Sequence, residues 1–219
     1  MTLFISESKD LWKNQDNLLD KFECNLAIGV DEVGRGCLAG PVVSAAVAFS
    51  SNPVCLKIFD SKTIKEKKRK LIYRDIFNCS PHVGIGIVPS SKIDEVNILN
   101  STKLSMKIAI DKCLESIIKN GKKSKNIILI DGNFTLPFSF GWGQLSIIKG
   151  DGKIASIAAA SIIAKVIRDE IMLIYDKIYP GYMLSKNKGY GTKVHFDAIK
   201  RLGFTNLHRK SFTLIHEGE

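Results

Sequence analysis

Five short runs of apolar residues are spaced along the chain, and each has the length of a buried β-strand. They occupy residues 25–32, 42–49, 83–88, 126–131 and 144–148. Apolar runs of this length, bounded by glycine and polar residues, are typical of strands that are covered on both faces. The pattern therefore predicts a sheet built from five strands.

Between these runs, apolar residues recur every three or four positions, which predicts helices. The predicted helices cover residues 63–77, 101–120, 154–179 and 193–202, and residues 1–24 leave room for a leading helix. The segment from residue 154 begins with small residues, as does a helix that packs closely on a sheet. Strands that first follow one another and then alternate with helices indicate an α/β or mixed-sheet architecture with a helical C-terminal part.

The composition of the chain limits the kinds of molecule that the protein is expected to bind. The chain has 219 residues, 45% of them hydrophobic, with a formal net charge of +10. This excess favours a polyanion, nucleic acid before anionic membrane, although a merely soluble basic protein is the alternative. The cysteines are scattered without a C-x-x-C pair, which argues against a disulfide framework and a structural zinc site. The apolar run 154–164 is too short to span a bilayer, and we expect a cytoplasmic protein with no membrane contact.

A glycine-rich stretch, GVDEVGRGCLAGP at residues 29–41, follows the first predicted strand. Its spacing is close to the dinucleotide-binding fingerprint, but that fingerprint requires a helix directly after the glycines. Here the strand-like residues 42–49 follow, so we exclude dinucleotide binding. A hairpin with glycines at positive φ explains the glycines, but not the acids at the end of a buried strand.

Acidic residues recur at the ends of predicted elements. Asp31 and Glu32 end the first strand, Asp131 ends the fourth, and Asp151 opens the long helix. The simplest roles are an ion pair with Arg35 for the first two and helix capping for Asp151. Ligands of open α/β sheets, however, bind outside the carboxyl ends of the strands. The acids can therefore share one edge of the sheet.

Carboxylates gathered at one place cannot all remain ionised without help. Oxygen ligands without a Cys or His cluster favour Mg²⁺ or Mn²⁺, and two such ions would neutralise the acids. Two ions about 4 Å apart bind both the attacking and the leaving oxygen of a phosphodiester. A basic protein with an acidic two-metal site is typical of a nuclease.

Several motifs resemble those of ribonuclease H type 2 (ribonuclease HII), in family order from about residue 26 to residue 212. They are VDEVGRGCLAGPVV, DSK at 60–62, IDGN, KGDGKIASIAAASIIAKVIRD, NKGYGT at 187–192 and HRKSF at 208–212. The resemblance implies an α/β, RNase H-like fold: a five-stranded mixed sheet with helices on both sides and a C-terminal helical segment. We expect an N-terminal extension at 1–24, a catalytic domain at 25–179, and a segment at 180–219 that completes the substrate site.

The resemblance also implies an activity. A protein of this family would cleave the RNA strand of RNA–DNA hybrids and cut 5′ to single ribonucleotides embedded in duplex DNA. The products would carry 3′-hydroxyl and 5′-phosphate ends. Carried over by motif, the catalytic and metal-binding acids would be Asp31, Glu32, Asp131 and Asp151. Neighbouring strand residues point to opposite faces, so Asp31 and Glu32 both serve the site only if the strand end twists or one helps through its main chain.

Two further motifs correspond to substrate-reading elements of the family. Gly34, Arg35 and Gly36 resemble the loop that reads the ribonucleotide. Missing Cβ atoms let a backbone approach the minor groove, where the 2′-hydroxyl distinguishes RNA from DNA, and an arginine holds a phosphate bidentately. Tyr190 resembles the tyrosine that packs on the sugar beside the ribonucleotide, whereas its spacing alone favours an ordinary loop aromatic.

Basic residues supply candidate phosphate contacts: Lys62 in a strongly basic stretch, and Lys165 with Arg168 on the long helix. The alternative for Lys62 is an ordinary charge on the surface. The alternative for Lys165 and Arg168 is pairing with Asp169 on the same helix. We expect Ser161 to pack rather than to line the site.

The sequence departs from the family at two places. Cys37 stands where the family usually has proline, which is expected to loosen the turn, and DSKTIK replaces the more usual DSK-x-L-S. Histidines are not required when a metal activates water, so His195 and His208 are left out of the catalytic set.

Two other functions remain open at this point. A DNA-specific nuclease of the same fold would keep the acids without needing the glycine and tyrosine motifs. A non-catalytic basic nucleic-acid-binding module would need no acids at all. We expect a monomer that acts on RNA–DNA hybrid and ribonucleotide-containing duplex DNA; the choice between the two metals and any clamp contact of the tail past Phe212 stay open.

Overall fold

The structure is a computed structural model that describes residues 10–53, 65–79, 82–119 and 125–212. It contains the predicted five-stranded mixed sheet, with the strand order β3-β2-β1-β4-β5. The strands are β1 (Leu26–Val33), β2 (Val42–Ala48), β3 (His82–Val88), β4 (Asn126–Asp131) and β5 (Gly143–Ile147). β2 pairs antiparallel with β1 and β3, whereas β4 pairs parallel with β1 and β5.

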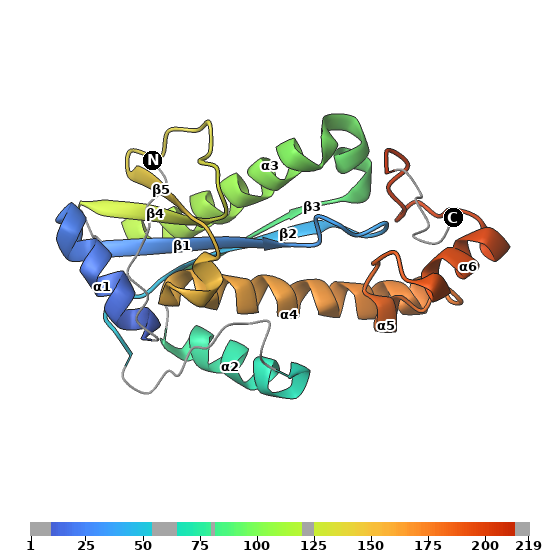
Figure 1. The fold of residues 1–219 in the computed structure, drawn as a ribbon, viewed down its shortest axis with the longest axis horizontal. Coiled ribbons are helices and arrows are strands. Elements are labelled where there is room, and N and C mark those ends of the chain that lie inside the picture. Colours follow the sequence, from blue (N-terminus) through green and yellow to red (C-terminus); the bar gives the residue numbers. More distant parts are fainter. Residues whose placement is uncertain (1–9, 54–64, 80–81, 120–124, 213–219) are drawn as a thin grey trace.

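Helices cover both faces of the sheet (Figure 1). One face carries α3 (Ser90–Lys119), and the other carries α4 (Ala155–Ile178) with α1 (Leu11–Phe22) and α2 (Glu66–Cys79) outside it. Alternate residues of the strands feed the two cores. In β1, Ile28 and Val30 pack toward α3, while Ala27 packs toward the α4 side. This alternation explains why the central strands are apolar along most of their length and why the pattern located them.

A smaller helical part lies beyond the C-terminal end of α4, as predicted (Figure 1). It contains the short helix α5 (Leu184–Asn187) and α6 (Lys193–Leu202), whose bounds match the prediction. No helix of the described ranges is long and apolar enough to cross a membrane. The described cysteines, Cys24, Cys37, Cys79 and Cys113, have free thiols, as expected.

Two predictions about helix starts were wrong. α3 begins at Ser90 rather than at residue 101, and Asn97 interrupts it with φ 66° and ψ 167°. The Asn97 side chain accepts a hydrogen bond from the Asn100 N–H at 3.0 Å, so it caps the part of α3 that follows. The first part, about two turns long, is too short for its periodicity to be recognised. Asp151 does not open α4: it lies in the 3₁₀ turn η1 (Gly150–Gly152) before the helix.

The N-terminus of α4 is capped by another helix. Ile154 precedes α4 and offers no capping side chain, but Gln15 of α1 accepts a hydrogen bond from the Ser156 N–H at 2.9 Å. Asn14, also in α1, donates to the Lys153 carbonyl at 3.0 Å. α1 therefore holds the start of α4 and the η1 turn against the sheet.

Candidate active site

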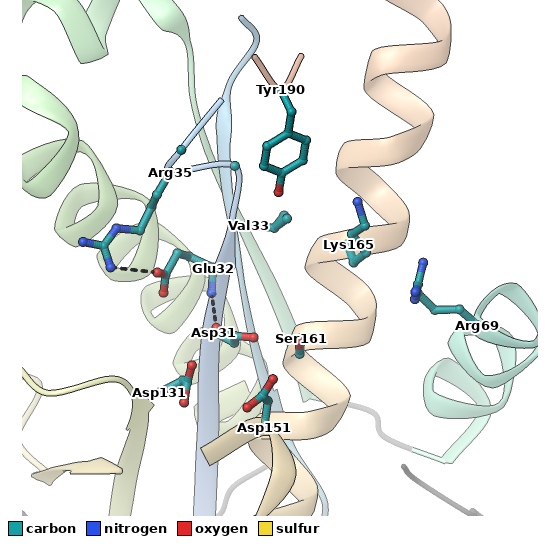
Figure 2. A pocket seen from close by; sticks show the side chains of 12 residues that line it. Asp31, Glu32, Val33, Arg35, Arg69, Asp131, Asp151, Ser161, Lys165 and Tyr190 are labelled. Carbon is teal, nitrogen blue, oxygen red and sulfur yellow. Dashed lines mark hydrogen bonds and ion pairs between the residues drawn. The ribbon is translucent and has the colours of Figure 1, made fainter. Parts of the chain in front are cut away.

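The predicted acids converge on one pocket of about 400 Å³ at the carboxyl ends of β1 and β4 (Figure 2). It is lined by Asp31, Glu32, Val33, Gly34, Arg35, Gly36, Arg69, Asp131, Asp151, Ser161, Lys165 and Tyr190. The acids come from β1, β4 and η1, segments far apart in sequence. Of the predicted site residues, all four acids, the glycine turn, Lys165 and Tyr190 therefore share one pocket.

The sheet register places Asp31 and Asp131 together. Val30 and Ile130 are opposite each other in the parallel β1–β4 pair, and each acid is the next residue of its strand. Both acids follow an apolar residue that faces α3, so both point to the α4 side. Gly29 makes that side compact, because a Cβ there would lie 2.1 Å from the Ser156 carbonyl carbon of α4.

Glu32 joins the pocket by both routes that the sequence left open. Its side chain lines the pocket beside Asp31, and its N–H donates to Asp31 Oδ1 at 2.7 Å. The Glu32 carboxylate also accepts a hydrogen bond from Arg35 Nη1 at 3.2 Å, so the predicted ion pair is present. Glu32 therefore helps to fix Asp31 while its own carboxylate is turned toward Arg35 (Figure 2).

Asp131 and Asp151 are linked through the backbone. Asp131 Oδ1 accepts a hydrogen bond from the Gly150 N–H at 2.6 Å, which ties the end of β4 to η1. Asp151 is the next residue and is buried, with 3% of its surface exposed. The tie brings the third segment of the site to the edge where the strands end.

The acids disturb one another electrostatically. Burial, and then the charges of Glu32 and Asp131, raises the pKa of Asp31 well above its ordinary value. Hydrogen bonds from Ser161 and from the Glu32 N–H act in the opposite direction but do not cancel the effect. Burial also raises the pKa of Glu32, against the favourable charge of Arg35. Such a group of carboxylates favours the binding of either protons or a cation.

Oxygen donors from the acids match the preference of Mg²⁺ and Mn²⁺. Among the described residues, no three or more His, Cys, Asp or Glu side chains are already arranged as a metal centre. The donor chemistry and the shared pocket nevertheless fit a divalent cation, because burial and then the charges of Glu32 and Asp131 raise the pKa of Asp31.

The turn that follows β1, residues 34–41, borders the acids. Gly34 has a φ of 97°, and a Cβ there would lie 2.2 Å from Arg168 Nε, so both conformation and space require glycine. Gly36 is different, because a Cβ there would meet no atom within 4 Å. The fold itself leaves open space at Gly36, which a ligand can use.

Arg168 corrects a prediction. It is fully buried, and its guanidinium donates to the carbonyls of Ala39, Pro41 and Lys188 at 3.1, 2.9 and 2.8 Å. In this position it supports the backbone and is not available to a phosphate. Arg168 lies on α4, as predicted, but its side chain is buried in the protein and does not face solvent.

Lys165 lines the pocket, where the predicted phosphate contact would be made. It also forms the ion pair with Asp169, at 2.8 Å, that was the alternative prediction. Tyr190 lines the same pocket, and 40% of its surface is exposed. Ser161 was expected to pack, but it lines the pocket and hydrogen-bonds to Asp31. Lys62, like the rest of DSK, lies outside the described residues.

Sequence reasoning missed two arginines. Arg69 of α2 lines the pocket; the basic character of this helix was the only signal for it. Arg209 is buried, and it donates to the carbonyls of Gly34, Arg35 and Gly40. Burial lowers the pKa of Arg209 to about 10, so its guanidinium is still charged at neutral pH. Arg209 could not be predicted, because an arginine that donates to main-chain carbonyls leaves no spacing pattern in the sequence.

His195 and His208 form a buried pair, and neither lines the pocket. Their Nε2 atoms are 3.2 Å apart. His208 Nδ1 accepts from the Thr205 N–H, and His195 Nδ1 faces the Tyr190 carbonyl at 2.9 Å. These partners place one proton on each ring, with His208 donating to His195. Leaving both histidines out of the catalytic set agrees with this geometry.

The acids at the carboxyl ends of central strands lie beside a glycine turn that is open to a ligand. In a chain with a formal net charge of +10, this arrangement is typical of an enzyme that hydrolyses nucleic acid. The comparisons with known proteins are specific. A sequence model of ribonuclease HII matches residues 28–215. Ribonuclease HII of Pseudothermotoga lettingae is 48% identical over 186 residues, which are 85% of this chain and 76% of the relative. The chain belongs to the ribonuclease HII family and is a ribonuclease H, an enzyme that acts on RNA–DNA hybrids.

Solved structures agree on the fold. The ribonuclease HII in the PCNA:RNase HII complex from Archaeoglobus fulgidus has a TM-score of 0.67 at 23% identity, covering 88% of this chain and 97% of that one. Bst-RNase HIII in complex with Mn²⁺ has a TM-score of 0.64 at 20% identity, covering 86% and 67%. Membership of the ribonuclease HII family makes the alternative of a non-catalytic binding module wrong. The solved structures confirm the RNase H-like fold.

Proposed function

We propose that this ribonuclease H cuts 5′ to single ribonucleotides embedded in duplex DNA, as well as within RNA–DNA hybrids. Cleavage would be hydrolytic, with two divalent cations, Mg²⁺ or Mn²⁺, and would leave 3′-hydroxyl and 5′-phosphate ends. The observation that carries the proposal is the shared pocket, in which the acids lie beside the open glycine turn and Tyr190 (Figure 2).

Asp31, Glu32, Asp131 and Asp151 are the proposed metal ligands. When bound, divalent cations supply a lowered pKa for the attacking water and charge stabilisation for the leaving oxygen. The protein holds the carboxylates ready: the Glu32 N–H and Ser161 orient Asp31, while the Gly150 N–H orients Asp131. The Mn²⁺ in the RNase HIII structure is consistent with this choice of metals.

The glycine turn is the proposed reader of the ribose. Gly36 combines open space with an ordinary backbone conformation, so no requirement of the fold explains its missing side chain. Close approach of a nucleic acid does explain it, because a 2′-hydroxyl can then reach main-chain groups of the turn. The exposed part of Arg35 is placed to add a phosphate contact after exchange from Glu32.

Tyr190 is the proposed contact to the sugar that follows the ribonucleotide. Its ring lines the pocket across from the acids and is only partly exposed (Figure 2). Lys165 and Arg69 flank the pocket on α4 and α2 and are proposed to bind the phosphates of the substrate, together with Lys62 from the segment outside the described residues.

The test is a duplex with one ribonucleotide, labelled at the 5′ end of that strand and incubated with Mg²⁺, with Mn²⁺ or with a chelator. We expect a single nick immediately 5′ to the ribonucleotide, a 3′-hydroxyl that a polymerase extends, and no product with the chelator. An all-DNA duplex is the control. Cleavage of that control at the same rate would favour a DNA-specific nuclease and overturn the proposal.

A further inference from the structure

Arg168 links the two segments to which substrate reading is assigned above. These segments are the reading turn (residues 34–41) and the Tyr190 segment (residues 188–190). One guanidinium donates to Ala39 and Pro41 of the turn and to Lys188 of the Tyr190 segment. Its Cζ also lies 5.9 Å from the centre of the Tyr190 ring, within range of a cation–π contact.

The two segments also meet directly. The N–H groups of Leu38 and Ala39 both donate to the Gly189 carbonyl, at 2.8 and 3.2 Å. A Cβ at Gly189 would lie 2.4 Å from the Ala39 carbonyl oxygen, so the backbones are as close as glycine permits. Cys37 and Tyr190 form a β-bridge beside this contact. A small change in the backbone at this point therefore alters the spacing between the turn and Tyr190.

Arg209 provides a comparison within the same molecule. It is equally buried, but within the described residues its side chain donates hydrogen bonds to the reading turn alone, at Gly34, Arg35 and Gly40. Within the described part of the chain, neither Arg168 nor Arg209 forms an ion pair. Two buried positive charges are thus held by main-chain carbonyls and by one aromatic ring each, Tyr190 for Arg168 and Phe212 for Arg209. This arrangement needs the planar set of donors that arginine has and lysine lacks.

We propose that Arg168 is a positioning residue that fixes the distance between the reading turn and Tyr190, and so sets the preference for a single ribonucleotide flanked by DNA. Such a substrate requires the ribose and the next sugar to be read together, which depends on that distance. A long hybrid offers many equivalent registers and depends on it less. This inference rests on the proposed function of the turn and of Tyr190.

The experiment compares kcat/KM on a duplex with one ribonucleotide with kcat/KM on a long RNA–DNA hybrid, and takes their ratio. Arg168→Lys should lower this ratio by about tenfold or more, because displacements near 1 Å can cost about a hundredfold in rate. Arg209→Lys alters hydrogen bonds to the turn but none to the Tyr190 segment, so it should affect the two substrates to a similar degree. Arg201→Lys, at an exposed arginine 3.5 Å from the Gly181 carbonyl, is the surface control and should leave both rates unchanged.

Combination with Tyr190→Ala distinguishes positioning from general damage. If Arg168 acts through Tyr190, the double variant should have the same ratio as Tyr190→Ala alone. Gly189→Ala is a second route to the same spacing that leaves the arginine in place, and it should lower the ratio as well. It decides the matter if Arg168→Lys does not fold, as judged by circular dichroism.

The proposal is overturned if folded Arg168→Lys and Gly189→Ala each lose activity equally on both substrates, or if Arg168→Lys and Tyr190→Ala combine multiplicatively. Wild-type protein that fails to cut at the single ribonucleotide would overturn the proposed function instead. The two failures are therefore distinguishable in one set of measurements.

Discussion

The acidic pocket and the reading turn adjoin each other, yet they handle buried charge in opposite ways. In the pocket, like charges from β1, β4 and η1 face one another, and the pKa of Asp31 is raised by burial and by its acidic neighbours. Beneath the turn, Arg168 and Arg209 are buried too, but each is surrounded by carbonyl oxygens.

The difference shows that the buried charges beneath the turn are stabilised within the protein, whereas those of the acidic pocket are not fully stabilised. The guanidinium groups have their hydrogen-bond acceptors within the protein, so the turn is fixed before substrate arrives. The carboxylates are oriented by the Glu32 and Gly150 N–H groups, but their mutual repulsion remains. Under the proposed function, the turn is a rigid surface for recognition, whereas the carboxylates of the pocket still repel one another and favour the binding of a cation.

The largest expected effect is on the pocket side of this comparison. Asp131→Asn removes a charge while keeping a similar shape and the hydrogen bond from Gly150. We expect kcat to fall by about a thousandfold or more, with binding to the hybrid retained or strengthened. Single-turnover cleavage and a gel-shift assay measure the two quantities.

Asp111→Asn is the matched control, since Asp111 is a half-exposed partner of Lys107 on α3. Its activity should equal that of the wild type. Metal-dependent turnover retained by Asp131→Asn would contradict the assignment of the acids.

A smaller effect is expected on the recognition side. Tyr190→Ala should reduce kcat/KM on a single embedded ribonucleotide by about 10- to 100-fold, because stacking and positioning of one sugar are lost. Cleavage of long hybrids should fall less. Steady-state kinetics on both substrates provide the check, and an equal loss on the two would argue against the junction role.

The smallest effect concerns stability and the buried histidine pair. Burial, and then the neighbouring His195, lowers the pKa of His208 to about 4. The neutral ring is thus favoured in the fold, and its contribution is present above the unfolded pKa near 6.5 and is lost as the pH falls toward 4. Between pH 7 and pH 5 the wild type should lose about 2 kcal/mol of unfolding free energy through His208.

Urea unfolding of the wild type and of His208→Gln at several pH values isolates this contribution, because the raised pKa values of Asp31 and Glu32 act in the opposite direction in both proteins. The difference between the two curves should narrow toward low pH. Parallel curves would show that His208 does not titrate in this window.

Much of the fold was predictable because the sheet is buried on both faces, so that strands such as β2 and β4 are apolar along most of their length. The convergence of Asp31 and Asp131 was predictable once the strands were located, because both acids lie near the carboxyl ends of central strands. The roles of Arg168 and Arg209 were not, because contacts between a guanidinium and main-chain carbonyls depend on backbone paths and leave no side-chain pattern. Ser161 was misjudged because a small residue on a buried helix face indicates packing equally well.

The most direct test of the account is the thermal midpoint of unfolding with and without Mn²⁺ for the wild type and for Asp31→Asn. Without metal, Asp31→Asn should melt a few degrees higher than the wild type, because it removes a carboxyl group whose pKa is raised by burial and by its acidic neighbours. Millimolar Mn²⁺ should raise the midpoint of the wild type and have little effect on the variant. A wild-type midpoint that does not respond to Mn²⁺ would contradict the claim that these acids form a cation site.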